Sequence, residues 1–384
     1  MKYQTAGTAG GCVIDARASE RPSFTEYHLT AISSGSPAEV FAAVAAEMAA
    51  KKIQPIQEKL YGKSWFRQEA LRLREQAWQK HGLDVGVPVT WIQGTPTGDG
   101  DFVGMQVWGI ASRDGGACVT TIENAATGRG RCWTGKGFRM VYLPSVRGTD
   151  PGGALASGRT AQAERMFANA GEGLKAHGLK YRNVARTWIY LARLLDWYGE
   201  LNRVRTAHYQ PEGVGVEGGV AFPASTGIQG RSGDEECLMD VLALDPGPSG
   251  GARATPIQRS PRQDSSFNYG SSFSRGMTLE IEGGRTVHIS GTASINTAGA
   301  TVHVGDAECQ SLETLMSIAA ILEEQGGGLR NIVQSTLFCK DRSACEAWTR
   351  VTRLLQVPAF PKVCVLADVC RPDLLVEMEA VAVI

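Results

Sequence analysis

The last segment of the chain alternates between apolar and acidic positions, as a buried β-strand does. From Leu374 to Ile384 every second side chain is apolar, while the opposite face carries Glu377 and Glu379 among apolar neighbours. A carboxylate in an apolar environment is costly unless it is paired or protonated, and burial raises its pKa. The pattern therefore predicts a closing strand with two candidates for a general acid near neutral pH. The alternatives are that Glu377 pairs with a buried arginine, or that both acids lie at a wet sheet edge.

The same order of elements occurs twice in the second part of the chain. Helix-period patterns end at glycine and lead into strands that begin at Asn183 and Asn331, and each copy then continues with a second helix and a closing strand. The predicted helices are Ala161–His177, Leu195–Arg205, Cys309–Gln325 and Ser343–Leu355, and the predicted strands are Asn183–Leu191, Cys237–Leu244, Asn331–Cys339 and Leu374–Ile384.

A more divergent third copy is predicted at the N-terminus. Helices are expected at Ser36–Lys51 and Trp65–His81, followed by strands at Pro88–Ile92 and Phe102–Ile110, without a counterpart of the Asn-containing strand. The expected fold is α+β, with mixed sheets that carry helices on one face. The expected units span residues 1–112, 113–250 and 262–384. Linkers are predicted at Tyr142–Ala154 and Asp245–Ser266, the second of which is polar enough to be mobile.

Composition excludes several classes of function. The 384 residues carry 39 basic and 39 acidic side chains, so we expect neither nucleic acid nor an anionic membrane as a partner. Residues 1–11 are polar and glycine-rich, without a signal core, and no apolar run is long enough to span a membrane. The nine cysteines form no metal-binding spacing and the six histidines are scattered. We expect a reduced, cytoplasmic protein without a metal.

The closing segment Val376-Glu-Met-Glu-Ala-Val-Ala382 resembles the end of RidA/YjgF-like proteins. In that fold a mixed sheet packs against two helices, and three units close around an axis with ligand clefts between them. The resemblance implies a pseudo-trimer within one chain, which could act as a monomer. The deaminase members carry a ligand-binding arginine shortly after the proline that matches Pro361, where Val363 stands here. This departure speaks against a simple imine deaminase.

Four motifs together are similar to those of the chorismatases, which remove pyruvate from chorismate. They are Phe222–Ile228 with Gly230-Arg231, Tyr269–Arg275, Ser290–Ser294 and Cys370–Glu377. One branch of that family makes a dihydroxycyclohexadiene carboxylate and others make hydroxybenzoates. The branch that makes 3-hydroxybenzoate carries a cysteine at a place similar to that of Cys370, whereas the diene-diol branch carries a small residue without sulfur. The resemblance thus implies 3-hydroxybenzoate and pyruvate as products.

Chorismate is a dianion with an enol ether, so its cleavage calls for a neutral acid and for fixed cations. By resemblance Glu377 is the catalytic acid, with Glu379 as its rival, and Cys370 assists the opening of an arene oxide. The arginine candidates for the substrate carboxylates are Arg231, Arg275 and Arg350, each of which could instead be a solvated surface residue.

Further substrate-binding candidates are neutral. Tyr269 and Ser272 could donate hydrogen bonds, although turn chemistry around Gly270 is the simpler role for this segment, and Ala293 could line the pocket. The reaction is redox-neutral, so no cofactor is expected. Hydrolysis to the diene diol, a mixture containing 4-hydroxybenzoate, and a Rid-like metabolite binder without turnover remain open.

Overall fold

Three sheets with the same strand order make up the protein. The computed structural model describes residues 2–4, 12–33 and 35–384, so that most of the polar segment 1–11 lies outside the described residues. Within them each sheet has six strands, and one strand pair in each, β4·β5, β10·β11 and β16·β17, is parallel. This confirms the predicted α+β class with tandem units of one fold.

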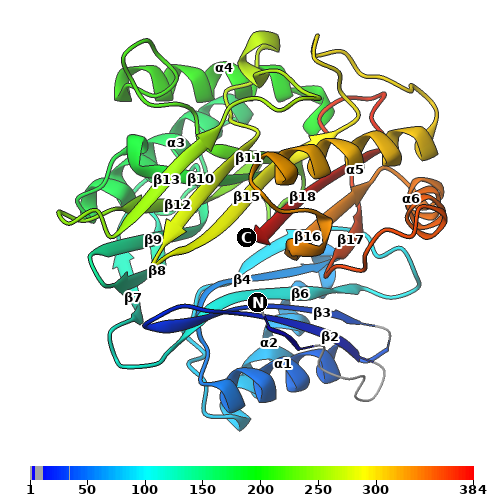
Figure 1. Cartoon of the computed structure of the whole chain (residues 1–384). Helices are drawn as coiled ribbons and strands as arrows, with labels where there is room; N and C mark the ends of the chain where they lie inside the picture. Colours follow the sequence, from blue (N-terminus) through cyan, green and yellow to red (C-terminus); the bar gives the residue numbers. More distant parts are fainter. Residues whose placement is uncertain (1, 5–11, 34) are drawn as a thin grey trace.

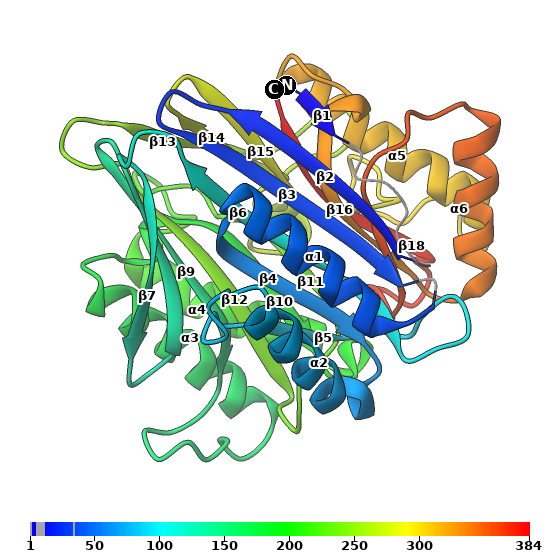
Figure 2. The same ribbon diagram turned by 90° about the horizontal axis from the view of Figure 1, so that it is seen from below.

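The first sheet has the order β1-β2-β3-β6-β4-β5 and carries helices α1 and α2. Figure 2 shows both helices on the outer face of this sheet. Pro37 occupies the first turn of α1, where a missing N–H costs nothing. The elements are β1 Lys2–Gln4, β2 Cys12–Glu20, β3 Phe24–Ser33, α1 Pro37–Lys51, β4 Gln54–Gly62, α2 Arg67–Lys80, β5 Thr90–Gln93 and β6 Phe102–Ser112.

The second sheet has the order β11-β10-β12-β9-β8-β7 and carries α3 and α4. Its long edge hairpin is formed by β7 and β8, which pair antiparallel. The elements are β7 Cys118–Asn124, β8 Gly128–Gly135, β9 Phe138–Arg147, α3 Arg159–Ala176, β10 Val184–Leu191, α4 Tyr198–Tyr209, β11 Ala224–Gln229 and β12 Cys237–Asp245.

The third sheet has the order β13-β14-β15-β18-β16-β17 and carries α5 and α6. Both helices begin at an aspartate whose side chain accepts a backbone N–H, Asp306 for α5 and Asp341 for α6. The elements are β13 Ala252–Ile257, β14 Gly276–Ile281, β15 Gly284–Ala293, α5 Ala307–Glu324, β16 Ile332–Cys339, α6 Arg342–Leu354, β17 Val363–Leu366 and β18 Val376–Val383.

The sheets face the middle of the molecule and the helices lie outside (Figure 1). Each sheet forms one apolar cluster with its own helices, and a central cluster joins side chains of all three units, among them Trp108, Tyr142 and Phe338. The central cluster therefore holds the three units against one another. Among the described residues no helix is both long and apolar enough to cross a membrane.

The structure corrects three predictions about elements. The N-terminal unit does have a counterpart of the Asn-containing strand, β4, contrary to the prediction. The sequence pattern missed it because its polar side chains, including Gln57 and Lys59, are buried against the other units rather than against helices. The predicted linker Tyr142–Ala154 overlaps strand β9, which runs to Arg147. The predicted mobile linker Asp245–Ser266 contains strand β13, an edge strand of the third sheet whose exposed positions are Arg253, Ala254 and Thr255.

The strand registers define equivalent positions in the three units. Strands β4, β10 and β16 each have an irregularity near their start, and after it Lys59 pairs with Gln106, Trp188 with Asp240 and Thr336 with Glu379. The partner strands are β6, β12 and β18. Two residues before Gln106, Asp240 and Glu379 on these strands lie Gly104, Leu238 and Glu377, which are therefore equivalent to one another. Only the third unit therefore carries an acid at the place of Glu377.

Candidate active site

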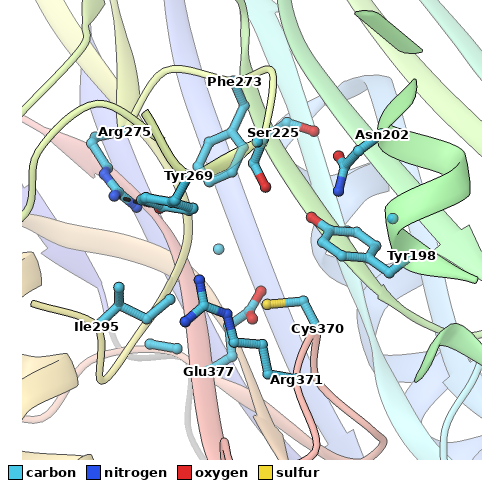
Figure 3. A pocket seen from close by; sticks show the side chains of 16 residues that line it. Tyr198, Asn202, Ser225, Tyr269, Phe273, Arg275, Ile295, Cys370, Arg371 and Glu377 are labelled. Atoms are coloured by element: carbon cyan, nitrogen blue, oxygen red, sulfur yellow. Dashed lines mark hydrogen bonds between the residues drawn. The ribbon is translucent and has the colours of Figure 1, made fainter. Parts of the chain in front are cut away.

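A pocket of about 350 Å³ lies between the second and third units. The second unit contributes α4 and β11, and the third contributes the ends of β15 and β18 and the segment before β14 (Figure 3). Its volume falls at the lower end of the range for small-metabolite sites. The lining residues are Tyr198, Gly199, Asn202, Ser225, Gly227, Tyr269, Gly270, Ser271, Phe273, Arg275, Gly291, Ala293, Ile295, Cys370, Arg371 and Glu377.

Glu377 is the acid of this pocket. It lies on β18 between its register partners Ala293 and Phe338, and only 4% of it is exposed. Loss of hydration, and then the charge of Glu379, raise the pKa of Glu377 to about 8, although Arg186 and Cys370 oppose the shift. The carboxyl group is therefore mostly protonated at neutral pH and can act as a proton donor.

Gly291 provides the space for this carboxyl group. It lies in the irregular stretch of β15 between Ile289 and Thr292, where the pairing with β18 shifts. A Cβ at position 291 would lie 2.1 Å from Oε1 of Glu377, well inside van der Waals contact. The backbone of β15 thus approaches the acid more closely than any larger residue would allow.

Glu379 has a different environment, although it lies two residues further on the same strand face. Its Oε2 accepts hydrogen bonds from Nη2 of Arg186 at 2.7 Å and from Oγ1 of Thr226 at 2.5 Å. Nζ of Lys59 lies 3.9 Å from Oε1. The alternative of a structural pairing with a buried arginine, considered above for Glu377, therefore applies to Glu379.

Two guanidinium groups face the pocket on either side of Tyr269. Both Arg275 and Arg371 lie 5.4 Å from the centre of the Tyr269 ring. The buried Arg275 donates to the carbonyl of Asp264 at 2.7 Å and to Oη of Tyr269 at 2.5 Å, and Arg371 donates to the carbonyl of Gly299 at 2.8 Å. These contacts hold two positive charges at fixed places, as binding of a dianion requires.

The remaining polar lining groups are neutral. Burial is the main cause that raises the pKa of the thiol of Cys370, with the charge of Glu377 second, and burial likewise raises the pKa of Tyr198. Both groups therefore keep their protons at neutral pH. Figure 3 shows Cys370, Arg371 and Glu377 on one side of the pocket, with Tyr269, Phe273 and Arg275 opposite them and Tyr198 and Asn202 on a third side.

Five of the predicted site residues line this pocket, and three do not. Glu377, Cys370, Tyr269, Arg275 and Ala293 come together from three separate motifs. Ser272 is fully buried beside the pocket, where its Oγ lies 2.5 Å from Oγ1 of Thr206.

Arg231 and Arg350, which were candidates for the substrate carboxylates, lie away from this pocket. Nε of Arg231 donates to Oε1 of Gln93 at 3.3 Å beside another pocket, of about 290 Å³, where all three units meet. Arg350 lies on the exposed face of α6, and its Nε donates to Oε1 of Glu308 at 2.7 Å. Both arginines are exposed, so water and these partners satisfy their charges without a substrate.

Sequence reasoning missed several residues that line the pocket. Arg371 follows Cys370 directly in a motif that we had singled out, so its position was the available signal. Ser225 likewise lies within the motif Phe222–Ile228. Tyr198 and Asn202, also of the second unit, had no such signal, because only the packing of one unit on another brings them to Glu377.

Comparisons with known proteins agree with this architecture. A family model described as endoribonuclease L-PSP matches residues 271–384. The 3-aminoacrylate deaminase RutC of Acinetobacter baylyi is 32% identical over 103 residues, which are 25% of this chain and 77% of that protein. The protein belongs to the L-PSP family, also called RidA/YjgF.

Solved structures extend the likeness of this RidA/YjgF-family chain beyond its last unit. A chorismatase crystal structure superposes with a TM-score of 0.58 at 20% sequence identity, over 85% of this chain and 92% of that one. A Rid-family protein from Yersinia pestis matches 34% of this chain with all of its own, at 21% identity and a TM-score of 0.30. At these identities the first of these likenesses shows a shared fold.

Proposed function

We propose that this protein is a chorismatase that converts chorismate to 3-hydroxybenzoate and pyruvate. The observation that carries the proposal is a protonated carboxyl group, Glu377, in one pocket with the two guanidinium groups of Arg275 and Arg371. A neutral acid and two fixed cations match an enol ether that carries two carboxylates. The chorismatase crystal structure with the same fold supports the choice of substrate.

In the proposed reaction Glu377 donates its proton to the terminal methylene carbon of the enolpyruvyl group. This step converts the enol ether into an oxocarbenium ion, which is a good leaving group. The 4-hydroxyl oxygen then attacks C3 of the ring, the ether C3–O bond breaks, and pyruvate departs with the ether oxygen as its keto group. The hydroxyl proton returns to the carboxylate of Glu377, which restores the acid for the next turnover.

The remaining ring intermediate is an arene oxide. Cleavage of its C4–O bond leaves the oxygen on C3, and loss of the C3 hydrogen makes the ring aromatic, which yields 3-hydroxybenzoate. No oxidant or water is consumed, because chorismate contains all the atoms of the two products. Cys370 keeps its thiol proton beside Glu377 and assists this opening as a neutral hydrogen-bond donor.

The test is to incubate the purified protein with chorismate in D2O and to identify the products by chromatography and mass spectrometry. The proposal expects equimolar 3-hydroxybenzoate and pyruvate, with one deuterium in the pyruvate methyl group because the acid delivers a solvent-derived proton to carbon. Lactate dehydrogenase and NADH in the same tube trap pyruvate before its methyl group exchanges.

Other outcomes overturn the proposal in part or in whole. A non-aromatic diol with deuterated pyruvate would keep Glu377 as the acid and remove the arene oxide and the role of Cys370. Binding of chorismate in calorimetry without any turnover would instead identify a Rid-like metabolite binder. Chorismate that neither binds nor reacts would exclude this substrate.

A further inference from the structure

The fold repeats the catalytic cleft between the third and first units, but with different chemistry. A pocket of about 730 Å³ lies there, between α6 and β17 on one side and the end of β3 and the loop from Pro96 to Asp101 on the other. Gly104 occupies the place of Glu377, so this cleft has no equivalent of the catalytic acid. In the strand register Cys364 takes the place that Gly227 has in the catalytic cleft.

Three cysteines come together at this second cleft. Cys339 ends β16, Cys345 lies in the first turns of α6 and Cys364 lies on β17, and their sulfur atoms are all within 4.8 Å of one another. The sulfurs of Cys345 and Cys364 are 3.3 Å apart. Cys339 is buried, whereas Cys345 and Cys364 are half-buried and line the pocket. The thiols are thus held by three elements of one unit, and those of Cys345 and Cys364 are open to small solutes.

We propose that Cys339, Cys345 and Cys364 form a binding site for one thiophilic d10 cation, Zn²⁺ or Cu⁺. Two thiolates on a tetrahedral zinc ion lie about 3.8 Å apart, since each Zn–S bond is about 2.3 Å. The sulfur atoms of Cys345 and Cys364 are 3.3 Å apart and all three lie within 4.8 Å of one another, so side-chain shifts of about 1 Å or less would close the ligand set. The pocket supplies room for a water molecule or a small ligand at a fourth position.

The cysteine spacing along the sequence gave no sign of this site, because the three residues come from separate elements that only the third sheet and α6 bring together.

The cluster holds one thiol more than a disulfide needs. An oxidised Cys345–Cys364 pair would leave Cys339 buried beside it, with no part in the bond. Three converging sulfurs match a metal ligand set better than they match a redox pair. The site also lies apart from Cys370, which belongs to the catalytic cleft, so metal binding and chorismate turnover can be tested separately.

The test uses the full-length protein, reduced and stripped of metal with a chelator. Zn²⁺ alone is titrated against a chromophoric chelator, and Cu⁺ is titrated anaerobically against bicinchoninate. We expect one equivalent of one of these ions to bind, with thiolate-to-metal absorption in the ultraviolet for Cu⁺. Cys345→Ser and Cys364→Ser should each weaken binding roughly 100-fold or more, because a hydroxyl group is a poor ligand for these ions.

Cys118→Ser is the matched control, since this exposed cysteine lies outside the cluster and its loss should leave binding unchanged. Circular dichroism and thermal melting of each variant show whether it folds. Unchanged stoichiometry and affinity in folded Cys364→Ser would overturn the site, as would the absence of binding in the wild type. A disulfide formed under mild peroxide, with two thiols consumed and no metal taken up, would replace the metal site by a redox pair.

Discussion

Glu377 and Glu379 are two residues apart on one strand face, yet their neighbours give them different roles. Glu379 receives hydrogen bonds from Arg186 and Thr226, which stabilise the carboxylate, whereas Glu377 faces the pocket beside the neutral thiol of Cys370. The charge of Glu379 contributes to the raised pKa of Glu377. The two carboxyl groups therefore have different environments, and of the two only Glu377 lines the pocket.

Removal of the acid should abolish the proposed reaction. Glu377→Gln keeps the shape of the side chain but has no transferable proton, so we expect kcat to fall by about 10³-fold or more. In the wild type the rate should stay constant at low pH and decrease as pH rises through about 8, because only the protonated form is active. Steady-state kinetics between pH 6 and 9.5 measure both effects, and full activity of Glu377→Gln would contradict the assignment.

Glu379→Gln tests how the neighbouring charge acts. Without this carboxylate the pKa of Glu377 should decrease, so the alkaline limb of the pH–rate profile should move to lower pH while a substantial kcat remains below that limb. Complete loss of activity in a folded Glu379→Gln protein, with Glu377→Gln still active, would exchange the roles of the two acids. Since the change leaves Arg186 and Lys59 without their partner, a thermal melt must accompany the kinetics.

The effect of a pocket arginine on KM can be compared with that of a surface arginine. Arg371→Gln removes one of the two pocket charges, and we expect KM for chorismate to rise about 10- to 100-fold, as loss of a charged hydrogen bond of about 1.5–3 kcal/mol implies. Arg350→Gln is the control, because its guanidinium pairs with Glu308 on the surface of α6, and KM should stay within about twofold. Equal effects of the two changes would show that Arg371 does not bind the substrate.

At the scale of single elements, the sequence was most informative where one face of an element is apolar. Helix α3 was predicted as Ala161–His177 and runs from Arg159 to Ala176, and β18 was predicted with the correct faces. Strand β4 was missed because the burial of its polar side chains depends on other units, which leaves no alternation in its own sequence. Contacts between units cannot be read from the pattern of one segment. The sequence around Glu377 therefore did not indicate that helix α4 of the second unit lines its pocket.

The irregular stretch of β15 leaves the space for the proposed acid Glu377, which makes Gly291 a sensitive point of this element. In Gly291→Ala the new methyl group would overlap Oε1 of Glu377 and displace the carboxyl group, and a displacement of about 1 Å can cost about 10² in kcat. Gly98→Ala is a matched control, since an added Cβ there meets nothing within 4 Å. Kinetics and thermal melts of both variants decide the point, and an unaltered kcat in Gly291→Ala would show that the acid tolerates the shift.

At the scale of the whole molecule, three copies of one fold surround a common centre but have different residues at equivalent places. Asp240 and Glu379 correspond to Gln106, and a protonated acid at the place of Glu377 occurs in one unit only. One cleft therefore holds the proposed catalytic acid, and the other clefts are free for different chemistry, such as the metal site proposed for the cysteine cluster. Such a division of function would require units that differ in sequence, which a trimer of identical chains cannot provide.

The same arrangement predicts the oligomeric state. Three units already enclose the central apolar cluster within one chain, so no partner chain is needed to bury it. We expect a monomer of 41.1 kDa in light scattering coupled to size-exclusion chromatography. A mass three times larger, independent of protein concentration, would show that the interior alone does not determine the assembly.

Two buried histidines, one in the first unit and one in the third, should make the stability of the folded protein sensitive to acid. His28 and His288 are buried on either side of Trp108, at 6.3 and 6.0 Å between ring centres. Burial, more than any neighbouring charge, lowers the pKa of His28 to about 4 and that of His288 to about 3. Glu26 opposes the shift at His28 and Arg21 adds to it, while Arg186, His28 and Lys59 add to the shift at His288.

Both imidazoles therefore stay neutral in the folded protein while the unfolded chain binds protons below about pH 6.5. The stability that they contribute is complete above pH 6.5 and is lost as pH falls toward 4. Between pH 7 and pH 5 each histidine should reduce the free energy of unfolding by about 2 kcal/mol. Glu377 acts in the opposite direction, because its raised pKa lets the folded state hold a proton that the unfolded state has released.

Because these contributions oppose one another, the decisive quantity is the change in pH dependence caused by one substitution. The decrease in unfolding free energy from pH 7 to pH 5, measured by urea denaturation, should be smaller by about 2 kcal/mol in His28→Gln than in the wild type. His303→Asn, at an exposed left-handed position that asparagine tolerates, should keep the wild-type dependence. If His28→Gln also kept it, proton uptake by other groups would have to account for acid unfolding, and the contact between the first and third units would not be the part of the molecule that senses pH.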